Sequence, residues 1–193
     1  IMNSSISQEI ITVANISSIT QTACWTSPSS DFVFSIAYSS SMNILAIASQ
    51  NIYLYNASTL ELIDLIETNY QVVDVAFHPN ESVLAFGGQL RDEVILWDLA
   101  EGSIVKTFSR EDKRLVGIDL LEDGNVLAVG YEDSGILWNF DSDFIEREIA
   151  EDGFPSTSPN GEYMVFRSWS WVRRWDLIEN MELNSLSGGD SVT

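Results

Sequence analysis

The sequence predicts an all-β fold in which one four-stranded antiparallel unit is repeated about four times. Three observations support this prediction. Ser, Thr, Ile, Val and aromatic residues are plentiful, whereas Lys and Arg together number only 9 in 193 residues, a balance that favours strands. Short runs of Pro, Asn, Asp and Gly, which supply tight turns, separate the apolar runs. Four β-prone stretches, called the anchor stretches below, end in an aromatic residue followed by Asp or Asn, at 52–56, 94–98, 136–139 and 172–176.

The aromatic residues of the anchor stretches recur at a nearly constant distance along the chain. They are Tyr55, Trp97, Trp138 and Trp175, separated by 42, 41 and 37 residues. A period of about 40–45 residues is typical of the four-stranded blades of a β-propeller. We therefore expect about four blades, with repeats at about 33–68, 71–109, 114–150 and 152–187, and we expect the four anchor aromatics to be structural residues.

The remaining strands follow the same order in each repeat. First strands are expected at 33–38, 72–77 and 115–120, with a degenerate fourth copy at 153–157. Second strands, whose Ala and Gly residues suit crowding near a central axis, are expected at 45–48, 83–87, 126–130 and 163–166. The anchor stretches form the third strands. The fourth strands alternate loosely between apolar and polar residues, as outer, half-solvated strands do, at 61–66, 103–108, 144–149 and 181–186.

Several short motifs resemble those of the WD40 family of β-propeller repeat proteins. The turns Phe77-His78-Pro79-Asn80 and Ser158-Pro159-Asn160-Gly161 and the pairs Trp97-Asp98 and Trp175-Asp176 are close to the turn and Trp-Asp signatures of that family. The resemblance covers roughly residues 33–187 and implies a WD40-like propeller whose loops present a shallow surface to a protein or peptide. Another antiparallel β repeat or a β-sandwich is the alternative fold.

The chain departs from the WD40 pattern in two places. Repeats of the family carry a Gly-His pair whose His joins a hydrogen-bonded tetrad, whereas the single His here, His78, falls in a turn, where we expect a surface residue. Asp92 and Asp133, each five residues before a Trp, could supply part of a tetrad. In the last anchor stretch Arg174 occupies the position at which the other repeats have Leu.

The two ends of the chain suggest an open ring. Residues 9–24 read as an additional N-terminal strand, and the resemblance implies that such a strand completes the last blade of a closed propeller. The sequence stops where a fifth repeat would begin. We expect a single domain over 1–193 that is an incomplete ring and a fragment of a longer propeller, with an apolar face exposed around 172–186 and self-association if the ring is open. A complete four-bladed ring is the alternative.

The charge of the chain excludes several classes of partner. Twenty-nine acidic residues against nine basic ones give a net charge of −20, so we expect no nucleic-acid binding and no attraction to an anionic membrane surface. No apolar run reaches the 18 or so residues of a membrane span, and the lone Cys24 allows no internal disulfide. The charge favours a basic protein partner or serves solubility alone. The sequence as a whole leaves the location open between the cytoplasm and export after removal of a leader.

The sequence contains no recognisable catalytic, cofactor or metal-binding constellation. One His and one Cys cannot form a zinc site or support a Ser-His-Asp triad, and no Gly-rich phosphate loop is present. Asp141-Ser142-Asp143 alternates oxygen ligands but lacks the Gly and the closing Glu of a calcium loop. We therefore expect a non-catalytic binding scaffold without a cofactor. The alternatives are a hydrolase or lyase, which would show polar groups of shifted pKa at the central channel, and a structural module of a larger surface or sensor protein.

Two groups of residues form the candidate partner-binding surface. Aromatic and basic residues lie close together before and within the last anchor stretch, and acidic pairs fall in loops between strands. The candidates are Trp169, Trp171, Arg173, Glu111, Asp112, Glu132 and Asp133. For the first group the favoured interpretation is space-filling by a degenerate repeat. For the second group ordinary loop solvation is an equally good explanation.

Overall fold

The computed structural model describes residues 32–89, 91–121, 124–139, 145–149, 153–158, 160–168, 170–179 and 181–187. This part of the chain is all-β: it contains strands and turns and no helix. It accordingly holds no helix of the length and apolarity that a membrane crossing requires. The predicted N-terminal strand over 9–24 lies outside the described residues.

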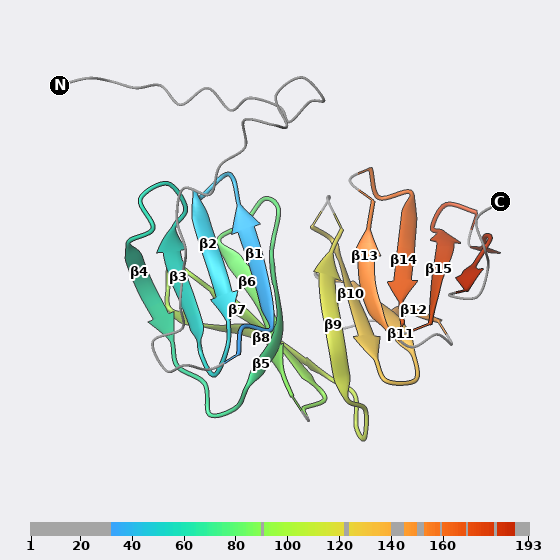
Figure 1. Cartoon of the computed structure of the whole chain (residues 1–193), viewed down its shortest axis with the longest axis horizontal. Coiled ribbons are helices and arrows are strands. Elements are labelled where there is room, and N and C mark those ends of the chain that lie inside the picture. The colour runs from blue at the N-terminus through green and yellow to red at the C-terminus, as the bar shows by residue number, and fades with distance from the viewer. Residues whose placement is uncertain are drawn as a thin grey trace. The chain divides into compact units, whose positions relative to one another are not determined.

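The strands form four antiparallel sheets, and the strands of each sheet pair in chain order (Figure 1). Sheet 1 contains β1 (Ser35–Ser39), β2 (Ile44–Ala48), β3 (Ile52–Asn56) and β4 (Leu62–Ile66). Sheet 2 contains β5 (Val72–Phe77), β6 (Val83–Gly88), β7 (Glu93–Asp98) and β8 (Ser103–Ser109). Sheet 3 contains β9 (Leu115–Leu120), β10 (Val126–Tyr131), β11 (Gly135–Asn139) and β12 (Ile145–Ile149). Sheet 4 contains β13 (Phe154–Thr157), β14 (Tyr163–Arg167), β15 (Trp171–Asp176), β16 (Met181–Glu182) and β17 (Leu186–Ser187).

The predicted fold class is confirmed: four four-stranded antiparallel sheets follow one another in a propeller-like arrangement. The first strands β1, β5, β9 and β13 lie next to one another in that order and form the inner edge of the unit. Within the described residues the sheets do not close a ring, because no strand of sheet 1 pairs with one of sheet 4. The fourth strand of the last repeat is less regular than predicted, since β16 and β17 pair separately with β15.

In three of the four anchor stretches the Asp or Asn at the end organises the turn after it, and the turn after Asn139 lies outside the described residues. The Asp98 carboxylate accepts hydrogen bonds from the backbone N–H groups two and three residues later, at 2.7 and 2.9 Å. Asp176 makes the same pair of bonds at 3.0 and 2.8 Å, and the Asn56 side-chain oxygen makes them at 3.0 and 2.9 Å. A short side chain with an acceptor oxygen closes such a turn without help from the rest of the chain, which explains why the motif repeats.

A β-bulge accompanies each anchor aromatic in the first three sheets. The register between the third and fourth strands shifts at Leu54/Tyr55, Leu96/Trp97 and Leu137/Trp138. A bulge places one extra residue on one strand and turns the following side chains to the other face. Ile104 of β8 therefore lies opposite Trp97, on the face of sheet 2 that is turned toward sheet 1.

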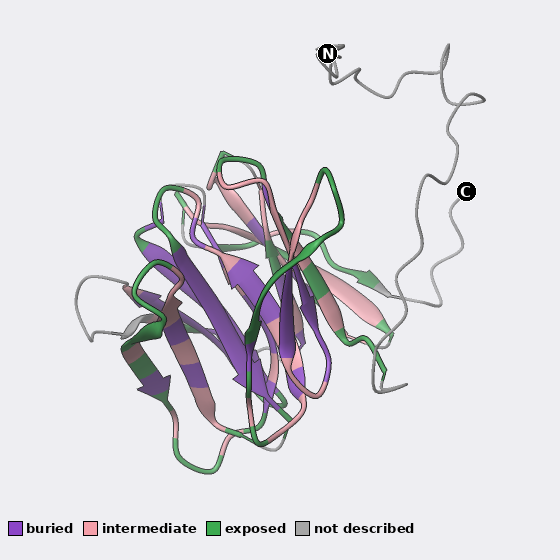
Figure 2. Ribbon diagram, turned by 90° about the vertical axis from the view of Figure 1, so that its left-hand side faces the viewer, coloured by how far each residue is buried: buried purple, intermediate pink, exposed green. Residues whose placement is uncertain are grey.

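The core consists of apolar layers between successive sheets. One cluster of buried side chains lies between sheets 1 and 2, a second between sheets 2 and 3, and a third between sheets 3 and 4. The central strands β6 and β10 are buried along their whole length (Figure 2) because both of their faces are covered, which explains their continuous apolar sequences. Gly130 lies at a close approach, where a Cβ atom would overlap the carbonyl oxygen of Gly153 in the next sheet.

Sheets 1 and 4 each have residues that no neighbouring sheet covers. Ile36 on β1 is 65% exposed, and Leu186 at the other end of the unit is 66% exposed. Arg174 is exposed as well, with its guanidinium 5.4 Å from the ring centroid of Tyr163. The matching Leu54, Leu96 and Leu137 are buried because another sheet follows theirs. Arg at this position is thus compatible with the last described sheet, where the side chain reaches solvent.

Candidate functional site

An apolar depression lies between sheets 1 and 2, and we call it the intersheet groove. Its volume is about 460 Å³. One wall is the connection from β4 to β5, and the other is the outer part of sheet 2. The lining residues are Ile66, Glu67, Thr68, Asn69, Tyr70, Phe86, Ile95, Trp97 and Ile104.

The groove combines exposed apolar surface with two aromatic rings. Trp97 is partly exposed, although Trp138 at the same position of sheet 3 is buried, and Ile104 is 54% exposed. The Tyr70 ring carries the Arg91 guanidinium 5.0 Å from its centroid. Burial raises the pKa of the Tyr70 hydroxyl, Arg91 opposes the shift and Glu93 adds to it. The groove can hold an apolar side chain against Trp97, with polar groups at one end to orient it.

A second depression, the inner-strand pocket, is bordered by the first strands of all four sheets. It has a volume of about 410 Å³ and contains the carboxylates of Asp74 and Asp119. Asp74 of β5 joins three sheets: it accepts hydrogen bonds from Ser35 Oγ of β1 at 2.6 Å and from the Ile118 N–H of β9 at 2.8 Å. Its own sheet supplies a third bond, from the Val75 N–H at 3.0 Å.

Asp119 performs the corresponding task between sheets 3 and 4. It accepts hydrogen bonds from the Thr157 N–H at 2.7 Å and from the Thr157 hydroxyl at 2.8 Å, and from the Leu120 N–H at 2.9 Å. Burial raises the pKa of Asp74 despite its hydrogen bonds, and the negative charge of Asp119 adds to the shift. Neither Asp74 nor Asp119 was among the candidates predicted from the sequence. The only available signal was an Asp within each of two otherwise apolar first strands.

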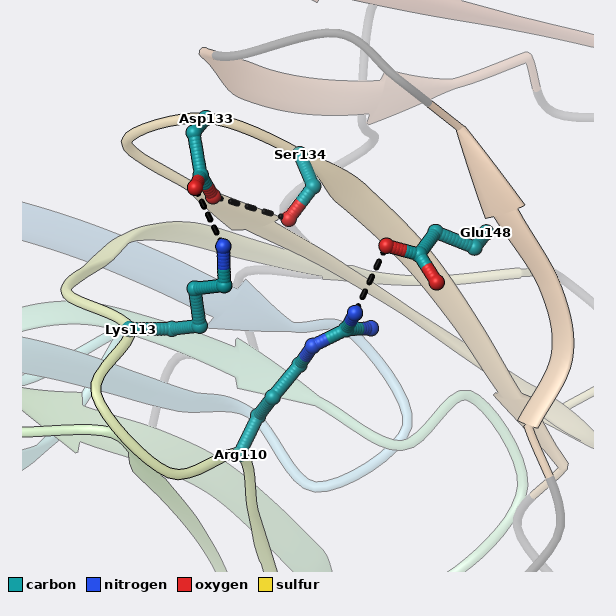
Figure 3. A network of polar contacts seen from close by, with 5 residues as sticks. All are labelled: Arg110, Lys113, Asp133, Ser134 and Glu148. Carbon is teal, nitrogen blue, oxygen red and sulfur yellow. Dashed lines mark hydrogen bonds and ion pairs between the residues drawn. The ribbon is translucent and has the colours of Figure 1, made fainter.

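Acidic candidates Glu132 and Asp133 lie beside the loop that contains Glu111 and Asp112. Asp133 is paired with Lys113 and also accepts a hydrogen bond from Ser134 Oγ at 3.1 Å (Figure 3). Glu132 is 3.4 Å from Arg114. The hydrogen bond from Lys113 lowers the pKa of Asp133. These contacts bring the two loops together, and they neutralise part of the acidic surface that the sequence suggested.

A further ion pair in the same region joins sheet 2 to sheet 3. Arg110, which directly follows β8, lies 2.6 Å from Glu148 of β12 (Figure 3). Because Glu148 is half-exposed, we expect this pair to contribute little to stability by itself. The position of this ion pair between sheets 2 and 3 indicates that it holds the loop after β8 in place and does not bind a partner.

The aromatic candidates are only partly covered by the structure. Trp169 lies outside the described residues. Trp171 and Arg173 both belong to β15, and the Arg173 guanidinium lies 5.1 Å from a Trp171 ring centroid. Arg173 also pairs with Glu182 of β16 at 3.2 Å. Both candidates therefore belong to an inner strand of sheet 4, which pairs with β14 on one side and with β16 and β17 on the other, and neither lines the groove.

His78 differs from the sequence-based expectation of a surface turn residue. It is in a turn, but only 5% of it is exposed. Its Nδ1 atom accepts hydrogen bonds from the Glu81 N–H at 2.9 Å and the Asn80 N–H at 3.2 Å. Its Nε2 atom therefore donates to the Gly124 carbonyl at 3.0 Å and ties sheet 2 to sheet 3. Gly124 has φ = +77°, and a Cβ atom there would overlap the imidazole, so the ring and the glycine fit as a pair.

The described residues contain no group of three or more His, Cys, Asp or Glu side chains placed to hold a metal ion. The loop with Asp141 and Asp143 lies outside this part of the chain. In the last anchor stretch the buried Trp175 Nε1 atom finds no hydrogen-bond partner among the described residues.

Comparison with known proteins adds no assignment to these sites. No family model matches the chain, and no curated protein matches it. The likeness to WD40 repeats therefore depends on the motifs quoted above, and the propeller-like fold depends on the sheets themselves.

Proposed function

We propose that this chain is a non-catalytic binding platform for a protein or peptide, and that the intersheet groove is its binding site. The observation that carries the proposal is the open groove of about 460 Å³ in which Trp97 and Ile104 remain partly exposed. Binding pockets combine apolar and aromatic walls with a few polar groups, and Trp and Tyr are enriched among the residues that dominate binding energies.

The electrostatics of the groove favour a basic partner. Of the described residues that line the groove, Glu67 alone is charged, and the whole chain carries a net charge of −20. A negatively charged surface speeds the encounter with a cationic partner and discriminates against an anionic one. Rim charges affect the rate of association more than the final affinity, so apolar contacts inside the groove supply most of the binding energy.

The inner-strand pocket supports a second candidate function, a hydrolase or lyase. The specific observation is the raised pKa of Asp74 in a pocket that also holds Asp119. Against this reading, each carboxylate already accepts three hydrogen bonds from the protein. Such bonds favour a structural role, so the binding platform is the better-supported function.

Two neighbouring residues of β8 give a matched test of the platform. Ile104 and Val105 are both 54% exposed, and only Ile104 lines the groove. Peptides are selected from a displayed random library on the unmodified chain, and their affinities are measured by calorimetry. Losing the Ile104 side chain from the contact weakens binding about tenfold, so we expect this loss for Ile104→Ser and no change for Val105→Ser. A library that yields no binder, or equal effects of the two substitutions, would contradict the proposal.

A further inference from the structure

We infer that the intersheet groove binds an aromatic side chain of a basic peptide, with the ring stacked on Trp97. This inference depends on the proposed function and specifies its ligand. Its basis is a comparison of two interfaces within the same molecule. The contact between sheets 2 and 3 is filled by aromatic rings, and the contact between sheets 1 and 2 lacks one of them.

The interface between sheets 2 and 3 shows what a complete contact looks like. Phe108 at the end of β8 stacks on Trp138 of β11, with ring centroids 4.9 Å apart and planes inclined by 21°. Tyr131 of β10 meets the same indole edge-on, at 6.4 Å and 86°. All three side chains are buried. Offset stacked and edge-on contacts are the favoured geometries of aromatic pairs.

The strand register identifies the matching positions between sheets 1 and 2. Trp97 lies opposite Leu84 as Trp138 lies opposite Leu127, so the two indoles are equivalent. Phe108 lies opposite the start of the third strand, at Val94, and Ile66 holds the same place opposite Ile52.

The position equivalent to Tyr131 is Gly88, the last residue of β6. A Cβ atom at Gly88 would overlap the Tyr70 ring, so Tyr70 supplies the second ring at this interface from the β4–β5 connection. Among the described residues none supplies the ring that corresponds to Phe108, because Ile66, which holds that position, is smaller and branched. The groove lies where that ring is missing, and Trp97 is left partly exposed as a result.

The charge around the groove indicates the rest of the ligand. Glu67 lines the groove, and Glu93 lies close enough to Tyr70 to act on its ionisation. The nearby cation, Arg91, lies over the Tyr70 ring. A peptide with Lys or Arg beside its aromatic residue can therefore place the ring on Trp97 and its charge near Glu67, whereas an acidic peptide is repelled.

The test uses four blocked peptides on the full chain. Three share Lys flanks and carry Phe, Leu or Ala at the centre, and the fourth carries Phe between Glu flanks. Affinities are measured by calorimetry, and the indole Nε1–H resonance of Trp97 is followed by NMR. We expect the Phe peptide with Lys flanks to bind about fivefold more tightly than the Leu peptide and about thirtyfold more tightly than the Ala peptide. We also expect an upfield ring-current shift of the Trp97 resonance and no detectable binding of the Glu-flanked peptide.

A filling substitution provides the second arm. Ile66→Phe supplies the missing ring, so we expect it to abolish peptide binding without lowering the melting temperature. Val105→Phe adds the same ring to β8 at an exposed position that does not line the groove, so it retains binding. The ranking of the peptide affinities on the unmodified chain tests the preference for an aromatic side chain even if Ile66→Phe fails to fold.

The outcomes separate this inference from the proposed function. If Leu binds as tightly as Phe, or if the Trp97 resonance does not move, the aromatic inference is wrong. The platform then still holds if library peptides depend on Ile104. If no Lys-flanked peptide binds and library peptides do not depend on Ile104, both are wrong.

Discussion

Replacing Asp74 with Ala removes the carboxylate that joins sheets 1, 2 and 3, and we expect this change to destabilise the protein by about 2 kcal/mol. The side chain accepts three hydrogen bonds, at 2.6, 2.8 and 3.0 Å. A hydrogen bond to a charged group contributes about 1.5–3 kcal/mol. Water entering the inner-strand pocket and the relief of a partly buried charge offset part of the loss, which brings the net effect to about 2 kcal/mol.

The assay is urea unfolding followed by tryptophan fluorescence, with thermal unfolding as a second measurement. For a unit of this size, about 2 kcal/mol corresponds to a fall in melting temperature of about 6 °C. Asp74→Asn is the matched control, because the amide keeps the shape of the side chain and one acceptor oxygen. We expect Asp74→Asn to lower the free energy of unfolding by about 1 kcal/mol at neutral pH. The substitution loses at least one of the three hydrogen bonds, and removal of the buried charge offsets part of that loss.

The pH dependence gives this prediction a defined sign. Burial raises the pKa of Asp74 in the folded chain above its ordinary value of 3.8, so the folded state holds the proton more tightly than the unfolded state does. The part of the stability that is linked to protonation of Asp74 is complete below pH 3.8 and is lost as the pH rises through the higher folded pKa, whereas the hydrogen bonds to the carboxylate persist above it. Asp74→Asn lacks this dependence, so its stability relative to the unmodified chain improves over that interval. Equal stabilities of Asp74→Ala and the unmodified chain at every pH would refute the reasoning.

Three further substitutions test other contacts between the sheets and loops. Gly130→Ala places a methyl group against the Gly153 carbonyl oxygen, and we expect a loss of about 1–3 kcal/mol in urea unfolding because the two sheets must move apart. His78→Ala removes a buried ring that makes three hydrogen bonds, and we expect a loss of about 2–3 kcal/mol and a lower melting temperature. Lys113→Met removes the hydrogen bond that lowers the pKa of Asp133. NMR titration should then show that pKa rising toward 3.8, with little change in stability because the pair is exposed.

Each of these three has an outcome that would contradict it. An alanine at position 130 that leaves the urea midpoint unchanged would mean that sheets 3 and 4 are not in close contact there. If His78→Ala is as stable as the unmodified chain, the hydrogen bonds of His78 do not stabilise the contact between sheets 2 and 3. The expectation of a surface residue would then be correct. An unchanged pKa of Asp133 in Lys113→Met would show that the pair does not form in solution.

The sequence predicted most of the fold because the relevant signals are local. An Asp such as Asp98 closes the turn that follows it by accepting hydrogen bonds from backbone N–H groups two and three residues away. The same pattern of a few residues gives the same turn after Asn56 and Asp176. Alternation and apolar runs mark strands over five or six residues. The split fourth strand of sheet 4 belongs to the least regular repeat of the sequence.

The candidate sites were less accessible to the same reasoning. Trp97 and Trp138 each follow an Ile-Leu pair and hold the same position in their repeats, and the neighbouring sheet is what distinguishes their surroundings. Phe108 covers Trp138, whereas Ile66 leaves Trp97 partly exposed. The acidic loops were found in sequence, but their ion pairs with Lys113 and Arg114 were not.

The sequence by itself determined the strand content, the four-part repeat, the turns and the excess of negative charge, since these depend on composition and on residues a few positions apart. Only the tertiary structure decided the hydrogen bonds of Asp74 to residues 39 and 44 positions away, the burial of His78 against a loop 46 positions away and the groove beside Trp97. These features arise where separate repeats meet, and the fit between two packed surfaces depends on the volumes of side chains that the chain order keeps far apart.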